Sequence, residues 1–350
     1  MVSIAIFNNK GGVGKTTLIC NLASYLNLKE NKRVLVIDAD PQCNASIYVT
    51  KDNDLEKIYS NVKTKTIYDI IRPLQRGSDY IETSNIPILT NQSFGFDIIL
   101  GDTRLSLSED FLSSDWIDGQ SGSPRGLKTT FLFKDLLQKL KGSYDYIFFD
   151  VGPSLGAINR NVLLSCDFFI IPMSSDIFSL KAIDNISESL NKWKQLVDDG
   201  LKKYQNEFEG EPYAIGGDNI NINLKFLGYI YQQYVTKTNK DGEKRPVKAF
   251  DSIIQKMSRT LSSKLEKFYT PSLNEEKLLI GEIPTLNSLI PLSQIAHKPI
   301  FTLSGSDGVV GAHFSKVREY ESVIKSISEN IRKLFVVLHS YGSHFNYQER

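Results

Sequence analysis

The sequence lacks the features that mark membrane-spanning, secreted and zinc-binding proteins. None of its apolar runs approaches the roughly 18 residues that span a bilayer, which excludes a transmembrane helix. The amino terminus has no charged segment followed by an apolar one, so we expect no secretory signal. Its three cysteines, Cys20, Cys43 and Cys166, have no metal-ligand spacing and are odd in number. We therefore expect free thiols in a reducing compartment.

Histidines are few, and the net charge is close to zero. The four histidines are scattered, and their neighbours complete neither a metal set nor a nucleophilic triad; they are His297, His313, His339 and His344. The formal net charge is +1, so any basic surface for nucleic acid has to be local. The apolar fraction of 41% is ordinary for a globular protein.

The sequence does contain a glycine-rich turn between an apolar strand and a helical segment. The strand is Val2 to Phe7, and helical spacing resumes at Leu18. A phosphate-binding loop requires this context, because glycines let successive N–H groups point inward at an electropositive helix N-terminus. The residues expected to bind the nucleotide phosphates are Lys10, Gly11, Gly12, Val13, Gly14, Lys15, Thr16 and Thr17. Lys15 is expected to reach the β- and γ-phosphates and Thr16 to bind Mg²⁺.

The loop departs from the ordinary G-x-x-x-x-G-K-[ST] pattern. Asn9 stands where the first glycine belongs, and a second lysine, Lys10, begins the loop. This K-G-G-V-G-K-T form closely resembles the deviant loop of ParA/MinD-type ATPases, in particular the ParA/Soj partition proteins. The resemblance covers roughly residues 2–335 and implies ATP and Mg²⁺ as ligands.

Three aspartates lie at or just after the ends of apolar segments that we expect to be parallel strands. Asp38 ends the strand at 32–38, Asp40 follows two residues later, and Asp150 ends the strand at 144–150. Open α/β sheets bind their ligands at this edge, and the strand ending in Asp150 has a Walker B arrangement with Mg²⁺ as its target. The resemblance implies that Asp38 organises Mg²⁺ and its water shell and that Asp40 positions the attacking water. Alone, the Asp38–Asp40 segment would indicate only a solvated turn.

Strands alternating with helices predict an α/β fold with one doubly wound, mostly parallel sheet, a Rossmann-like three-layer P-loop NTPase. The expected strands are 2–7, 32–38, 96–101, 144–150, 167–172, 224–231 and 278–284. We expect one domain over 1–350, with insertions near 113–126 and 198–223 and no N-terminal helix-turn-helix. Residues 115–126 are rich in glycine, serine and proline and predict a surface loop. Helical segments are expected to end before Pro73 and near Leu196.

Other matches to the family are partial. Pro284 corresponds to a proline near the adenine, but Leu286, with Asn287 beside it, stands where the family has asparagine. Gly152 replaces a proline after Asp150, and Asp176 replaces a glutamate. Contacts to the base from the loop after Pro284 therefore stay open.

Lys10 is the most discriminating feature. Lys15 already neutralises the β- and γ-phosphates, so a second lysine has no evident phosphate of its own chain to contact. By resemblance, Lys10 crosses the interface of a face-to-face ATP dimer and stabilises charge on the transferred phosphoryl group. The alternative is a solvated loop lysine.

A locally basic segment indicates a second partner. Between Lys237 and Lys267, nine basic and four acidic residues give a net charge of +5. Such a segment can neutralise DNA phosphates without reading sequence, although a solvated helix face has the same appearance. The candidate DNA contacts are Lys244, Arg245, Lys248, Lys256 and Arg259.

The leading hypothesis is a ParA-like ATPase for plasmid or chromosome partition or cargo positioning. It would form homodimers with ATP, bind non-specific DNA, respond to a ParB-like activator and lie in the cytoplasm on the nucleoid. Without a helix-turn-helix, sequence-specific repression is not expected. The alternatives are a signalling or defence ATPase, a related ligase or kinase, and a MinD-like membrane switch. The polar tail at 339–350 disfavours the membrane switch, and the cysteine positions exclude a cluster-carrying reductase.

Overall fold

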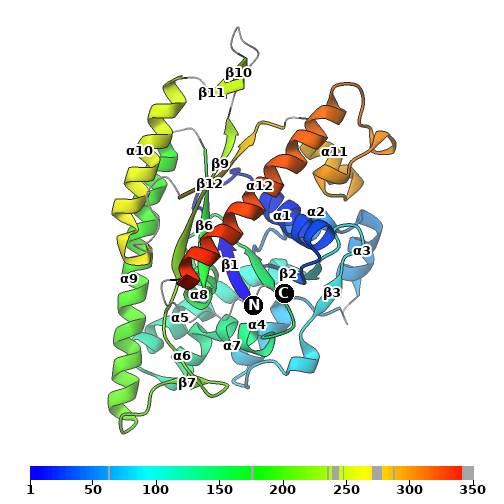
Figure 1. Ribbon diagram of the computed structural model, residues 1–350. Helices are drawn as coiled ribbons and strands as arrows, with labels where there is room; N and C mark the ends of the chain where they lie inside the picture. Colours follow the sequence, from blue (N-terminus) through cyan, green and yellow to red (C-terminus); the bar gives the residue numbers. More distant parts are fainter. Residues whose placement is uncertain are drawn as a thin grey trace.

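A computed structural model of the chain describes residues 1–61, 64–174, 177–234, 236–238, 244–246, 248–269, 278–286 and 288–340. Its centre is an eight-stranded sheet in the order β12-β9-β6-β1-β5-β2-β4-β3 (Figure 1). Neighbouring strands are parallel, except that the edge strand β3 runs antiparallel to β4. The predicted doubly wound, mostly parallel sheet is confirmed.

The strands of this sheet are β1 (Val2–Ile6), β2 (Val34–Asp38), β3 (Ile88–Thr90), β4 (Asp97–Ile99), β5 (Tyr146–Asp150), β6 (Phe168–Met173), β9 (Lys225–Tyr234) and β12 (Leu279–Pro284). Two small hairpins pair β7 (Ala214–Ile215) with β8 (Asp218–Asn219) and β10 (Thr236–Thr238) with β11 (Lys244–Pro246). All seven expected strands are present. The short, partly exposed β3 carries no clear apolar alternation and was not predicted.

Helices cover both faces of the sheet. They are α1 (Lys15–Glu30), α2 (Asn44–Val49), α3 (Asp52–Ser60), α4 (Tyr68–Gln75), α5 (Glu109–Gln120), α6 (Pro124–Thr130), α7 (Leu132–Lys139), α8 (Ala157–Ser165), α9 (Ile177–Glu207), α10 (Lys248–Lys264), α11 (Leu289–Ala296) and α12 (His313–Ser340). Single 3₁₀ turns are η1 (Thr83–Asn85), η2 (Thr103–Ser108), η3 (Glu266–Phe268), η5 (Ile300–Thr302) and η6 (Gly305–Asp307).

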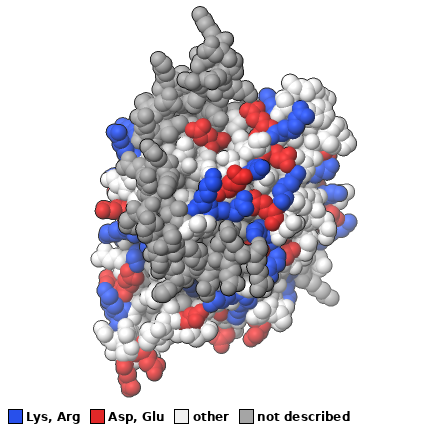
Figure 2. Space-filling view, in the orientation of Figure 1, with Lys and Arg blue, Asp and Glu red and all other residues white. Residues whose placement is uncertain are grey.

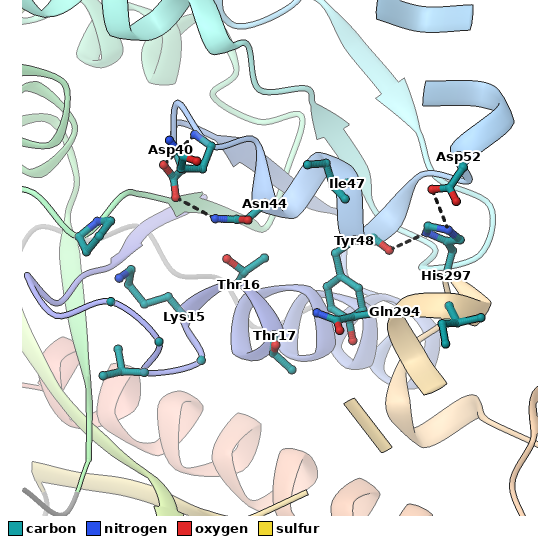
Figure 3. A pocket seen from close by; sticks show the side chains of 17 residues that line it. Lys15, Thr16, Thr17, Asp40, Asn44, Ile47, Tyr48, Asp52, Gln294 and His297 are labelled. Atoms are coloured by element: carbon teal, nitrogen blue, oxygen red, sulfur yellow. Dashed lines mark hydrogen bonds and ion pairs between the residues drawn. The ribbon is translucent and has the colours of Figure 1, made fainter. Parts of the chain in front are cut away.

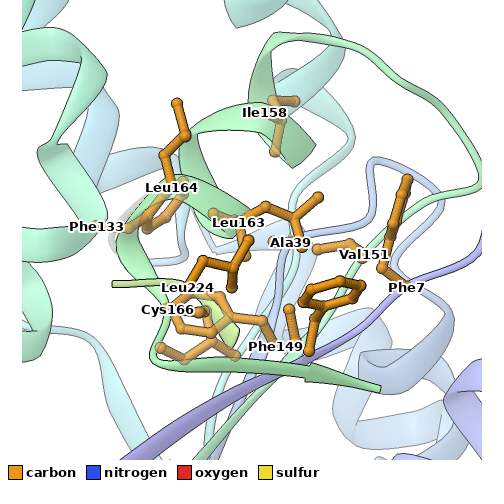
Figure 4. Close-up of a cluster of buried hydrophobic side chains, with 14 of the residues drawn as sticks. Phe7, Ala39, Phe133, Phe149, Val151, Ile158, Leu163, Leu164, Cys166 and Leu224 are labelled. Atoms are coloured by element: carbon orange, nitrogen blue, oxygen red, sulfur yellow. The ribbon is translucent and has the colours of Figure 1, made fainter. Parts of the chain in front are cut away.

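The central strands are buried on both faces, and alternate residues enter opposite layers of the core. Ala5 and Phe149 pack toward the layer that contains α4 to α10. Figure 4 shows Phe149 in this layer beside Val151 and Leu224. Ile4 and Phe148 pack toward the layer that contains α1, α2, α11 and α12. This arrangement is the three-layer sandwich expected from the strand–helix alternation.

The layer with α1 and α12 joins two distant parts of the sequence. Ion pairs link Lys29 to Glu321 at 2.7 Å and Glu30 to Arg332 at 3.4 Å. Glu30 also accepts a hydrogen bond of 2.7 Å from Ser328. Figure 2 shows basic and acidic side chains interspersed on this face, so its described part has no extended patch of one sign.

The predicted surface loop at 115–126 is wrong, because α5 and α6 occupy most of it. A Cβ atom at Gly126 would lie 2.1 Å from the Gly119 backbone nitrogen. The glycines that suggested a loop therefore allow two helices to pack closely. Ser123 caps α6 with a hydrogen bond to the Gly126 N–H, and Pro124 takes the first helical position, where its missing N–H costs nothing.

Other helix boundaries also differ from expectation. α4 continues through Pro73 to Gln75, because its apolar face of Ile70, Ile71 and Leu74 is buried in the core. α9 extends from the expected end near Leu196 to Glu207, so part of the proposed insertion at 198–223 is helical. Asp176, Asn287 and the tail at 341–350 lie outside the described residues. Of the helices that are described, none is long and apolar enough to cross a membrane.

Candidate functional site

The phosphate loop connects β1 to α1 at the carboxyl edge of the sheet. Gly12 and Gly14 have φ of +71° and +72°, which is the left-handed region that favours glycine. The Lys15 side chain turns back along the loop, and its Nζ donates to the carbonyl oxygens of Asn8 and Lys10, each at 3.2 Å. Burial lowers the pKa of Lys15, and the charges of Asp150 and Asp40 oppose that shift. The buried ammonium is therefore held at the centre of the loop.

The three predicted carboxylates meet beside this loop. The register of β2 with β5 pairs Asp38 directly with Asp150. Thr16 Oγ1 donates to Asp150 Oδ2 at 2.7 Å, which brings the first turn of α1 onto the end of β5. Asp40 follows on the loop after β2 and is 5% exposed. The structure thus brings together Lys15, Thr16, Asp38, Asp40 and Asp150.

Helix α2 supplies two partners of these carboxylates that the sequence reasoning missed. Asn44 Nδ2 donates to Asp40 Oδ2 at 3.2 Å. Ser46 donates to Asp38 Oδ2 twice, from its backbone N at 2.8 Å and its Oγ at 2.7 Å. Because both follow Asp40 closely, they could have been found as polar residues in the first turns of the next helix.

Burial makes Asp38 and Asp150 costly to ionise. It raises the pKa of Asp38 to about 7, with a further rise from Asp40 and an opposing effect of the hydrogen bonds from Ser46. Burial and the neighbouring Asp38 raise the pKa of Asp150 well above its usual range. A cation at this edge would relieve both costs.

The residues fit a magnesium ion with few protein ligands. Among the described residues, no three His, Cys, Asp or Glu side chains are arranged so that they could hold a metal ion by themselves. Mg²⁺ commonly takes one or two protein oxygens together with phosphate oxygens and water. The buried carboxylate of Asp150 and the hydroxyl of Thr16, already 2.7 Å apart, are a donor set of that kind.

A cavity of about 700 Å³ opens in front of the phosphate loop (Figure 3). The loop residues from Gly11 to Thr17 and Asp40 form its inner wall. Tyr48, Gln294 and His297 line its outer end. His297, expected to be structural or on the surface, therefore also borders the site. Its Nδ1 lies 3.1 Å from the Tyr48 carbonyl oxygen.

A second cavity of about 290 Å³ lies on the other side of Gly14, toward β9 and β12. Pro284, Leu286 and Gln232 line it. Gln232 is 4% exposed, and its Nε2 has no hydrogen-bond partner in the described part of the chain. Its Oε1 would lie 2.1 Å from a Cβ atom at Gly14, so this glycine makes room for it. Gln232 was not predicted, because one glutamine near the end of a strand carries no distinctive pattern; it lies within β9, beyond the expected end of that strand at 231.

The second lysine of the loop contacts its own chain. Lys10 Nζ donates to Ser174 Oγ, after β6, at 3.2 Å. Among the candidate DNA contacts, Lys256 and Arg259 are exposed on α10. The side chains of Lys244, Arg245 and Lys248 lie outside the described part of the structure.

The sequence matches a known family and several partition proteins. Residues 1–203 match the AAA_31 family, an AAA domain. An uncharacterized protein of Methanocaldococcus jannaschii is 29% identical over 245 residues, 70% of this chain and 78% of that protein. The chromosome partitioning protein ParA of Myxococcus xanthus is 29% identical over 57% of this chain and 61% of that protein. The sporulation initiation inhibitor protein Soj of Bacillus subtilis is 32% identical over 52% of this chain and 62% of that protein. The chain thus spans about six tenths of the length of the Myxococcus xanthus and Bacillus subtilis relatives.

Solved structures share the fold. Protein DIP2308 of Corynebacterium diphtheriae has a TM-score of 0.70 at 27% identity, over 96% of this chain and 99% of that one. The ATP complex of a Cyanothece McdA variant has a TM-score of 0.61 at 14% identity, over 95% of this chain and 96% of that one. Together with the deviant phosphate loop, these matches show that the chain belongs to the AAA_31 family and is a ParA/MinD-type P-loop ATPase.

Proposed function

We propose that this chain is an ATP-driven partition or positioning switch. It binds Mg²⁺-ATP, dimerises face to face, binds DNA without sequence preference, and releases the DNA after slow hydrolysis. The observation that carries the proposal is the convergence of Lys15, Thr16, Asp40 and Asp150 on one edge of the sheet. The Myxococcus xanthus ParA and Bacillus subtilis Soj relatives support the proposal.

Each residue has a separate part in the proposed chemistry. The loop N–H groups and Lys15 would hold the phosphates, and Thr16, Asp38 and Asp150 would hold and orient Mg²⁺, whose charge would offset that of the phosphates. Asp40, fixed by Asn44 at 3.2 Å, orients the water that attacks the γ-phosphate. The adenine would enter the smaller cavity, where Pro284 and the Gln232 amide, whose Nε2 has no hydrogen-bond partner among the described residues, would contact it.

Lys10 makes the site depend on a second copy of the chain. It leaves Ser174 when ATP binds and reaches the nucleotide of the partner subunit, where it stabilises charge as an arginine finger does elsewhere. Loss of the γ-phosphate then separates the subunits. Exposed basic residues on α10, including Lys256 and Arg259, contact the DNA backbone, and a ParB-like protein stimulates hydrolysis on the nucleoid in the cytoplasm.

The test is binding of the full chain to random-sequence duplex DNA with ATP, with ADP and without nucleotide. Wild type should bind only with ATP. Lys10→Ala should neither dimerise nor bind, whereas Asp40→Ala should bind and remain bound because hydrolysis is blocked. Lys141→Ala, which removes an exposed lysine at the opposite edge of the sheet, is the matched control and should behave as wild type.

Two outcomes would contradict parts of the proposal. Equal DNA binding in all nucleotide states would contradict the switch. ATP-dependent dimers without DNA binding would favour a signalling, defence or MinD-like role. If DNA binds through α10, Lys256→Ala with Arg259→Ala should weaken it for all sequences and reduce its salt dependence.

A further inference from the structure

Helix α2 donates hydrogen bonds to Asp38 and Asp40. Tyr48, on the same helix, connects α2 to its neighbours. Asn44 contacts Asp40, and Ser46 contacts Asp38. Tyr48 lies four residues after Asn44 and so on the same side of the helix. Any rotation or shift of α2 therefore moves the Asn44 amide relative to the Asp40 carboxylate.

The Tyr48 hydroxyl joins three elements. Asn21 Nδ2 of α1 lies 3.1 Å from it, and Ser293 Oγ of α11 lies 2.6 Å from it. Ser293 Oγ in turn donates to the Lys298 carbonyl oxygen at 2.5 Å. A hydroxyl has one proton to donate, so Ser293 accepts from Tyr48, and Tyr48 accepts from Asn21. The direction of every bond in this chain follows from its last acceptor.

The network is buried and complete. Tyr48 is 4% exposed, and Asn21 and Ser293 are 0% exposed. Asn21 also donates to the Thr17 carbonyl oxygen and accepts from the Ile300 N–H, each at 2.8 Å. Satisfied buried networks fix one arrangement, because any other leaves a polar group without a partner or water.

Helix α11 lies between the two cavities. Ile290 and Pro291 line the smaller cavity, and Gln294 and Ile295 line the larger one. Ser293 stands between these pairs in the sequence and points to Tyr48. The bond from Tyr48 to Ser293 therefore connects the wall of the proposed base site to the helix that holds Asp40.

We infer that Tyr48 is a positioning residue for ATP hydrolysis. Its hydroxyl, held between Asn21 and Ser293, sets the position of α2 and thereby the Asn44–Asp40 pair. It contacts neither of the reacting groups. This inference rests on the proposed function, because it assigns Tyr48 a part in the same hydrolysis.

The test is Tyr48→Phe in the full chain, which keeps the ring and its edge-on contact with Phe94 but removes the hydroxyl. We expect kcat to fall by about tenfold, because small displacements of positioned groups are costly, while KM for ATP stays within about twofold. Stoichiometric binding of a non-hydrolysable ATP analogue shows that the loss is not one of folded protein. Tyr144→Phe is the matched control, since its buried hydroxyl donates to Asp97 at 2.8 Å at the opposite edge of the sheet.

A double-mutant cycle separates positioning from general destabilisation. If Tyr48 acts through Asn44, Tyr48→Phe should lower kcat no further in an Asn44→Ala background. Equal kcat values for wild type and Tyr48→Phe, or additive losses in the cycle, would overturn the inference alone. A wild type without Mg²⁺-dependent hydrolysis would overturn the proposed function and the inference with it.

Discussion

Thr16 Oγ1 and Asp150 Oδ2 lie 2.7 Å apart, so each proposed magnesium ligand is the partner of the other. The hydroxyl donates to a carboxylate that burial would otherwise leave costly to ionise. A cation that enters has to replace this hydrogen bond with two metal–oxygen contacts. The bond therefore keeps the ligands in place and also opposes the metal.

Thr16→Ala should abolish the magnesium dependence of nucleotide binding. Without the hydroxyl, Mg²⁺ loses one protein ligand, and we expect ATP affinity in Mg²⁺ to fall by about tenfold or more. Thr16→Ser keeps the hydroxyl and should remain near wild type. Calorimetric titration with Mg²⁺ and with a chelator measures the difference, and equal magnesium effects in all three proteins would contradict the assignment.

Asp38→Asn should change how the stability of the nucleotide-free protein depends on pH. The folded pKa of Asp38 is about 7, and the unfolded value is about 3.9. Between these values the folded chain binds more protons, so the free energy of unfolding of wild type falls as pH rises from 4 to 7. The variant lacks this penalty and should melt about 5 °C above wild type at pH 8 but not at pH 4. Parallel melting curves across this range would rule out the buried ionisation.

Gly152→Ala should slow hydrolysis without weakening ATP binding. A Cβ atom at Gly152 would lie 3.0 Å from Asp40 Oδ1, so the carboxylate has to shift by a few tenths of an ångström. We expect kcat to fall by roughly three- to tenfold at constant KM. Gly305→Ala, whose Cβ would meet nothing closer than 3.8 Å, is the control. Unchanged kcat would mean that the position of Asp40 is not critical.

Gln232→Leu should weaken binding of ATP but not of inorganic tripolyphosphate. The change removes a buried amide with no partner for its Nε2 in the described part of the chain, while keeping a similar volume. Loss of a base hydrogen bond predicts about tenfold weaker ATP binding. Tripolyphosphate lacks the base and reports on the phosphate loop alone. If both ligands bind more weakly, Gln232 acts through its contact with Gly14 instead.

Gly200→Ala should destabilise the fold away from the site. Its Cβ would lie 2.2 Å from the Gly119 carbonyl oxygen, so α9 and α5 would have to separate. We expect the free energy of unfolding to fall by about 2–3 kcal/mol in urea titrations, with ATP affinity retained. An unaffected midpoint would show that these helices have room to adjust.

The sequence predicted the sheet and the position of the loop between β1 and α1 well, because both follow from local patterns. Apolar strands and the loop from Lys10 to Thr17 are continuous segments with one physical interpretation. Gln232 and Tyr48 could not be predicted, since the residues beside them, Gly14 and Ser293, lie far away in the sequence. The same limit explains the error at 115–126, where Gly119 and Gly126 suggested a turn but serve helix contact. The composition of a segment does not show which other segment packs against it, and that contact decided the structure here.

The links between α1 and α12 bear on the order of events during synthesis. The helix that follows the phosphate loop is completed early, yet Glu30 finds Ser328 and Arg332 only near the end of the chain. Asn21 likewise accepts a hydrogen bond from the backbone N–H of Ile300, which is synthesised much later. While the ribosome is still adding α12, the phosphate loop and α1 have been synthesised, but α12 does not yet pack against α1. A chain in which α12 has yet to be made therefore lacks these contacts to the helix that follows the phosphate loop.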